Sequence, residues 1–117
     1  MWRIRTHRMG IDRGSHMLFS DFQDGGEMWS GTGEREARVR VDFSEPFLAP
    51  PAVQVGLSMW DVDHSANHRM DIAAEEVSET GFALVFRTWG DTKVARVRAD
   101  WIAMGEVAHD DDWDLTV

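Results

Sequence analysis

The sequence predicts an all-β domain of six antiparallel strands, arranged as a sandwich or a barrel. Four segments alternate apolar with polar or charged side chains at a period of two, which is typical of half-buried strands. No helical pattern of about 10–15 residues lies between them, so parallel strands joined by helices are not expected. Turn residues separate the segments at the short spacing of antiparallel sandwiches and barrels.

The four strongly alternating segments are 37–43, 53–59, 82–87 and 95–101. In the first of them, valines alternate with Arg38 and Arg40, so a register shift of one residue would place arginine in the core. Residues 68–75 form a weaker candidate with Met70 and Ile72 on one face. Residues 9–13 form a short candidate at the start of the chain, which brings the number of predicted strands to six.

Prolines and glycines mark the ends of these strands. Pro50 and Pro51 end one connection and open the next strand. The segments 79–81 and 90–92 are predicted to be tight turns between antiparallel neighbours. The longest irregular stretch, 20–34, contains four glycines and no helical pattern, so we expect a flexible loop there.

The chain of 117 residues has the size of one domain, expected over residues 1–107 with a short leader at 1–8. Residues 108–117 are acidic and are expected to form a frayed tail. The absence of cysteine excludes disulfides and thiolate metal sites. The sequence shows no signal-peptide pattern and no run long enough to span a membrane. We therefore expect a soluble protein, whose localisation and export route the sequence does not display.

Charge and motifs restrict the class of function. A formal net charge of -9 argues against a nucleic-acid-binding face and against docking on anionic lipid. The sequence has no nucleophile motif, no paired metal-binding histidines on a helix and no phosphate-binding glycine loop. With 21 acidic residues, carboxylate pairs arise by chance and do not indicate a glycosidase. The sequence thus predicts a binding protein that is not an enzyme and has no cofactor.

Two residues suit the chemistry of sugar binding. Arg69 offers several donors in a rigid fork, which matches a pair of adjacent hydroxyls. Trp89 ends a predicted strand and offers a flat apolar surface for the C–H face of a sugar ring. The structural alternative is that Trp89 caps the core and Arg69 is a solvated edge residue. The residues alone favour this structural alternative.

Asp61, Asp63, His64 and Asn67 form a polar cluster after the predicted strand 53–59. Carboxylates with a histidine can bind a divalent cation. A loop that caps its own backbone with aspartate side chains explains the same cluster. We therefore predict no metal site, with Asp61, Asp63 and His64 as weak candidates.

Apolar residues also occur on the second face of the predicted sheets. Ala83 and Val85 point away from Phe82 and its neighbours, and Ile102 follows the last strand. A domain with one core leaves such a face without cover. This pattern favours association of the chain with itself.

Several short segments occur in a specific order and spacing, and together they identify a family. They are Phe43-Ser44-Glu45-Pro46-Phe47, Pro50-Pro51, Val53, Leu57-Ser58, Asp61-Val62, Asn67, Arg69, Thr80-Gly81-Phe82, Thr88-Trp89, Asp91-Thr92-Lys93-Val94 and Trp101-Ile102, with Gly10 and Asp12 as a looser match. In these segments the chain resembles the H-type lectin domain, a family that includes the snail agglutinins and the C-terminal domain of the slime-mould discoidins. The resemblance covers residues 35–103.

This resemblance implies a six-stranded antiparallel β-sandwich that assembles as a homotrimer, with a hexamer of two trimers as the larger alternative. It implies a shallow site for galactose or N-acetylgalactosamine glycans where protomers meet. An arginine at the place of Arg69 grips ring hydroxyls, and a tryptophan at the place of Trp89 lines the sugar. The predicted function is therefore a multivalent lectin. The alternative is a structural trimerisation or capping module of a larger surface assembly, with a degenerate sugar site.

Other site positions of the family differ in this chain. Gly90 stands where the snail members carry a histidine near the acetamido group, and Ala95 stands where they carry a tyrosine. The family's carboxylate in the preceding loop is replaced by Thr32, with Ser30 beside it. A shifted loop could supply a carboxylate instead from Asp24, Glu27 or Glu34. The predicted carbohydrate-binding residues are thus Arg69, Trp89, Gly90, Ser30 and Thr32.

Overall fold

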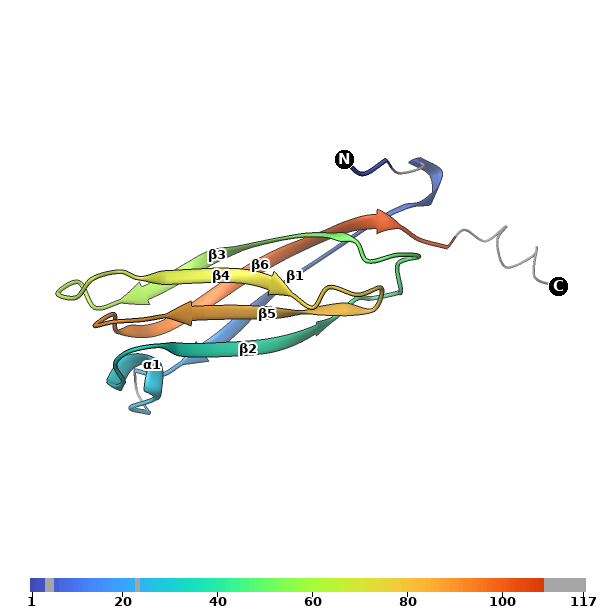
Figure 1. Ribbon diagram of the computed structural model, residues 1–117. Helices are drawn as coiled ribbons and strands as arrows, with labels where there is room; N and C mark the ends of the chain where they lie inside the picture. The colour runs from blue at the N-terminus through green and yellow to red at the C-terminus, as the bar shows by residue number, and fades with distance from the viewer. Residues whose placement is uncertain (4–5, 23, 109–117) are drawn as a thin grey trace.

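The computed structural model describes residues 1–3, 6–22 and 24–108. This part of the chain forms six strands in two antiparallel sheets of three strands each, so the predicted β-sandwich is confirmed (Figure 1). The β6 sheet has the order β1-β6-β3 and the β5 sheet has the order β2-β5-β4. The strands are β1 Met9–Ser20, β2 Arg35–Asp42, β3 Ala52–Val62, β4 Met70–Glu75, β5 Gly81–Thr88 and β6 Val94–Glu106.

The core lies between the two sheets and is built mainly from the central strand of each. Phe82, Leu84 and Phe86 of β5 are fully buried, as the alternation predicted. They face the inward side chains of β6, among them Val97 and Trp101. Complete burial of each large side chain contributes about 1.5–3 kcal/mol, so these central strands dominate the stability of the sandwich.

Strand β1 is much longer than the predicted segment 9–13. It pairs with β6 from Met9 opposite Glu106 to Ser20 opposite Arg96. The alternation is obscured in its middle by Gly14 and two polar residues. Gly14 is required there because an added Cβ would lie 2.6 Å from the indole nitrogen of Trp101. A glycine that signals a break in the sequence therefore allows close packing inside a continuous strand.

The predicted tight turn at 90–92 is wrong in one respect. It was expected to join antiparallel neighbours, but β5 and β6 are the central strands of different sheets. The segment after Thr88 instead carries the chain from one sheet to the other, with Gly90 at a φ of 70°. A glycine turn signal does not distinguish a hairpin from a crossover, because both need the same local bend. The turn at 79–81 does join neighbours, namely β4 and β5.

The expected loop 20–34 begins one residue later than predicted and contains a one-turn helix, α1 (Glu27–Ser30). The Asp21 carboxylate accepts a hydrogen bond of 3.0 Å from the backbone N–H of Met28. Met28 itself is only 4% exposed and packs into the core near Phe86. Four residues are too few to show a helical period, which explains why the sequence did not reveal this helix.

The expectation that Ala83 and Val85 await a partner is wrong. Both are buried within a single chain, at 4% and 0% exposure. Ala83 and Val85 lie on the outer face of the β5 sheet. Ion pairs of Arg87 with Glu36 and Glu75 cross this face. Long charged side chains cover apolar surface with their aliphatic stems, and this network therefore seals the face.

Ile102 differs from these two residues, since it lies half-buried on the outer face of β6. Its neighbours on that face include Met104, and Ile11 of β1, which is paired with Met104 and is 62% exposed.

No helix in the described residues is long and apolar enough to cross a membrane. At the start of the chain, a short 3-10 helix, Thr6–Arg8, occupies the end of the expected leader. The predicted acidic tail lies outside the described residues except for Ala108.

Candidate functional site

The ends of three strands meet at one end of the β5 sheet. Arg35, the first residue of β2, and Met70, the first residue of β4, both lie opposite Thr88, the last residue of β5. Figure 1 shows these strand ends at the same end of the molecule. Arg69 lies one residue before β4 and Trp89 one residue after β5, so both are brought to this end. The register of the sheet thus gathers segments far apart in the sequence.

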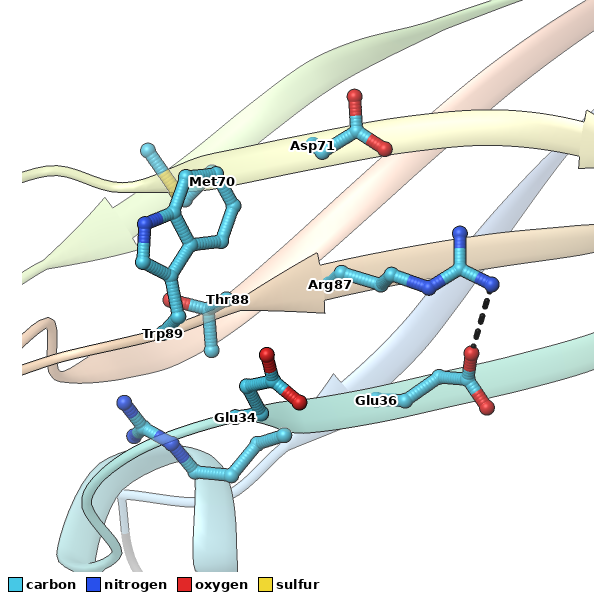
Figure 2. Close-up of a pocket in the computed structure, with 8 residues that line it drawn as sticks. Glu34, Glu36, Met70, Asp71, Arg87, Thr88 and Trp89 are labelled. Atoms are coloured by element: carbon cyan, nitrogen blue, oxygen red, sulfur yellow. Dashed lines mark ion pairs between the residues drawn. The ribbon is translucent and has the colours of Figure 1, made fainter.

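A hollow of about 730 Å³ opens at this end of the sheet. Figure 2 shows the Trp89 indole at one side of it, with the Glu34 carboxylate pointing up from the start of β2. Arg87 and Glu36 form an ion pair of 2.9 Å on the opposite side, and Asp71 lies above it on β4. The hollow therefore combines one exposed aromatic surface with several polar groups.

Trp89 offers an accessible indole rather than a buried one. Its side chain is 42% exposed, although Thr88 directly before it is 1% exposed. The indole makes no hydrogen bond with any described residue, and the carboxylates of Glu34 and Asp71 take no ion-pair partner among them. These groups can therefore bind a ligand without first breaking a contact within the chain.

The backbone of Arg69 is fixed while its guanidinium is unengaged. Its N–H donates to the Thr92 hydroxyl at 2.9 Å, and its carbonyl accepts from the Thr88 hydroxyl at 2.6 Å. The guanidinium makes no hydrogen bond or ion pair with the described residues. It lies beside Gly90, where an added Cβ would be 3.2 Å from the Arg69 Nε.

A buried arginine holds the surrounding segments together. Arg35 is 3% exposed and donates through its guanidinium to the carbonyls of Met28, Gly33 and Gly90, at 3.0, 3.0 and 3.3 Å. Among the described residues no carboxylate pairs with it. One side chain thus ties α1, the loop before β2 and the segment after Trp89 into a single support for the site.

The segment after Trp89 is also held from the other side. The Asn67 amide donates to the Asp91 carboxylate at 3.3 Å. This hydrogen bond is the main reason that the pKa of Asp91 lies below its ordinary value, with the positive charge of Arg69 as a smaller contribution. Asp91 is therefore ionised at neutral pH and helps to position the loop.

The model of the H-type lectin domain family matches residues 38–104 of this chain. The matched segment contains Arg69, Trp89 and Gly90. The chain belongs to the H-type lectin domain family. Membership of this family supports a carbohydrate-binding role.

The known proteins similar to this H-type lectin domain include one from Fuscovulum blasticum and the discoidins of Dictyostelium discoideum. A protein of Fuscovulum blasticum, named ATP synthase subunits region ORF 7, is 60% identical over 107 residues, which cover 92% of this chain and 93% of that protein. Discoidin-2 of Dictyostelium discoideum is 35% identical over 77 residues, which cover 64% of this chain and 30% of the discoidin.

The solved structure of recombinant discoidin II of Dictyostelium discoideum matches with a TM-score of 0.73 and 26% identity. The match covers 86% of this chain and 38% of the discoidin chain. The H-type lectin domain described here therefore spans about a third of the length of the discoidins.

Of the five predicted residues of the lectin site, only Trp89 lines the hollow, whereas Arg69, Gly90, Ser30 and Thr32 do not. Ser30 and Thr32 precede the segment matched by the family model. The Ser30 hydroxyl donates to the carbonyls of Gly25 and Gly26 at 2.8 and 2.9 Å, so its proton is already used within the loop. Thr32 is exposed, and the N–H of the next residue, Gly33, donates to the Gly90 carbonyl at 3.0 Å.

Sequence reasoning did not single out Glu36, Asp71 and Arg87 as part of this hollow. Arg87 could have been found, because it precedes Trp89 by two residues, and alternation along an extended segment places such residues on the same side. Asp71 could not, since its place opposite Arg87 depends on the pairing of β4 with β5. Glu34 was an alternative carboxylate, and it lines the hollow together with Trp89.

The three weak metal candidates do not converge. The Asp61 carboxylate pairs with Arg96 at 3.4 Å. Asp63 accepts from the backbone N–H and the hydroxyl of Ser65, which lowers its pKa and marks it as a cap of its own loop. Within the described residues, no group of three metal-ligating side chains forms.

Proposed function

We propose that this H-type lectin domain binds neutral galactose-type sugars beside Trp89, without catalysis and without a metal ion. The observation that carries the proposal is the exposed Trp89 indole at the side of a hollow in which the carboxylates of Glu34 and Asp71 take no ion-pair partner among the described residues. The indole would cover the apolar C–H face of the ring. Glu34 and Asp71 would accept hydrogen bonds from ring hydroxyls, and Arg69 would donate to an adjacent pair.

The position of Gly90 indicates which sugars the site would accept. A side chain at this position would lie against Arg69, since an added Cβ comes within 3.2 Å of its Nε. With glycine there, the chain has no group at that place to contact an acetamido substituent. We therefore expect similar affinities for galactose and N-acetylgalactosamine.

Self-association would compensate for weak individual sites. A shallow site of this kind suits a dissociation constant of about 1 mM, or about -4 kcal/mol. The outer face of the β6 sheet exposes Met9 and Ile11, which are 41% and 62% exposed. A homotrimer, or a hexamer of two trimers, that covers this face would present several sites to one glycan-rich surface and gain avidity.

Calorimetric titration of the wild type and of two variants with galactose and N-acetylgalactosamine tests the site. Arg69→Ala should weaken binding by about 1.5–3 kcal/mol, or more than tenfold, because a charge-assisted donor fork is lost. Trp89→Ala should weaken it by a similar amount through lost apolar contact. Trp60→Ala is the matched control, since Trp60 is 55% exposed and lines no part of the hollow.

Folded, associated variants that bind as tightly as the wild type would contradict the proposed site. If the wild type itself shows no measurable binding of either sugar, this result would favour the alternative, a structural trimerisation or capping module of a larger assembly.

A further inference from the structure

We propose a second saccharide-binding site on the outer face of the β6 sheet, next to α1. A hollow of about 540 Å³ lies there, lined by Phe22, Trp29, Asp61 and Arg96 among others. It shares no lining residue with the hollow beside Trp89. The proposal therefore adds a site to the lectin function and does not depend on the first one.

The apolar wall of this second hollow is held in place by an aromatic pair. The rings of Phe22 and Trp29 meet edge to face, with centroids 4.9 Å apart and planes at 81°. Phe22 is nevertheless 57% exposed. An aromatic ring that is fixed by a neighbour yet open to solvent is suited to cover the C–H face of a sugar ring at little cost in side-chain entropy.

The polar floor of the hollow is an ion pair that is neutral as a whole. The Asp61 carboxylate and the Arg96 guanidinium are 3.4 Å apart, and each side chain is 54% exposed. Arg96 keeps spare N–H donors, and Asp61 keeps spare acceptor positions. The exposed Ser20, which faces Arg96 across the strands, adds a hydroxyl.

This combination decides the class of ligand. Because the charges of Asp61 and Arg96 balance each other, the ion pair gives neither an anion nor a cation a net electrostatic attraction. A neutral ligand with adjacent hydroxyls can donate to Asp61 and accept from Arg96 at the same time. A neutral pyranose satisfies both the ion pair and the aromatic wall.

The second hollow would stay open if the chain associates through its exposed apolar residues. Ile11 and Ser20 lie nine positions apart on β1. At about 3.3 Å per residue they are separated by about 30 Å along the strand. A partner that covers Ile11 therefore leaves the end of the sheet near Ser20 accessible, and each chain would present two sites.

Nitrogen-15 NMR of the tryptophan indoles tests the proposal, with methyl galactoside, methyl glucoside and methyl mannoside as probes. We expect the Trp29 indole signal to shift with at least one probe, both in the wild type and in Trp89→Ala. Phe22→Ala and Asp61→Asn should each weaken this response about tenfold. Trp60→Ala should leave it unchanged, because Trp60 lies outside the hollow.

Three outcomes would overturn the second site. The Trp29 signal could fail to move with any probe, it could move equally in folded Phe22→Ala and Asp61→Asn, or its shift could vanish in Trp89→Ala. Failure of the first site has a different signature, namely a Trp89 signal that stays still while the Trp29 signal moves.

Discussion

The outer faces of the two sheets differ in how they are covered. On the β5 sheet, Val85 is fully buried beneath a network of ion pairs that includes Arg87 and Glu75. On the β6 sheet, Ile11 is 62% exposed and Met104 beside it is only half-buried. Both faces belong to strands with similar alternating patterns. Charged neighbours on adjacent strands therefore decide whether an apolar residue is covered by its own chain or left for a partner.

The largest expected effect comes from placing a charge under the ion-pair network. Val85→Asp should destabilise the fold by about 4 kcal/mol or more, because the new carboxylate would be buried without a partner. Urea unfolding at neutral pH measures this change. A loss of less than about 1 kcal/mol would mean that Val85 is not sealed by its own chain.

Placing the same charge on the other face should affect association instead of stability. Ile11→Asp should reduce the mass of the particle measured by light scattering, while unfolding of the isolated chain changes by less than about 1 kcal/mol. Leu48→Asp is the matched control, since Leu48 is 50% exposed but lies outside the strands of this sheet. A monomeric wild type at micromolar concentration, or equal masses for all three proteins, would contradict the account.

The smallest expected effect is the loss of stability at low pH that comes from protonation of Glu75. A hydrogen bond from Arg87 is the main reason that the pKa of Glu75 lies below its ordinary value of 4.5. A depressed pKa stabilises the fold above the ordinary value, and this contribution is lost as the pH falls through the lowered pKa.

The melting temperature should therefore fall on acidification below this ordinary value. Glu75→Gln should show a shallower fall than the wild type. If the melting temperatures of the two proteins fall equally as the pH decreases below 4.5, the ion-pair network on the β5 sheet does not depend on the Glu75 charge.

The alternation in the sequence was sufficient to predict the strands and the inward faces of β5 and β6, because burial on one face imposes a period of two. It could not predict that the segment after Trp89 crosses between sheets, nor that Val85 is covered, since both depend on which strands are neighbours. Gly14 concealed the length of β1, because a glycine within a segment suggests a strand end. The glycine is needed there only because the Trp101 indole on the adjacent strand leaves no room for a side chain. Local alternation thus predicts where the strands lie, whereas the contacts of each side chain depend on which strands pair.

In the candidate site, too, some residues could be predicted from the sequence, and others depend on how the strands pair. Arg69 and Trp89 were predicted from side-chain chemistry and from the family resemblance, and the structure places both at one end of the β5 sheet. The place of the Asp71 carboxylate in the site could not be predicted, because it depends on the register of β4 against β5. The support provided by Arg35 could not be foreseen, because its three acceptors are backbone carbonyls from separate segments.

A glycan array probed with the wild type and with Trp89→Ala tests the central claim, that this domain is a lectin whose main site lies at Trp89. We expect the wild type to be retained on galactose- and N-acetylgalactosamine-terminated glycans to a similar extent. Trp89→Ala should lose most of this signal while remaining folded and associated. An array on which the wild type binds no glycan, or on which the two proteins give the same pattern, would contradict the account.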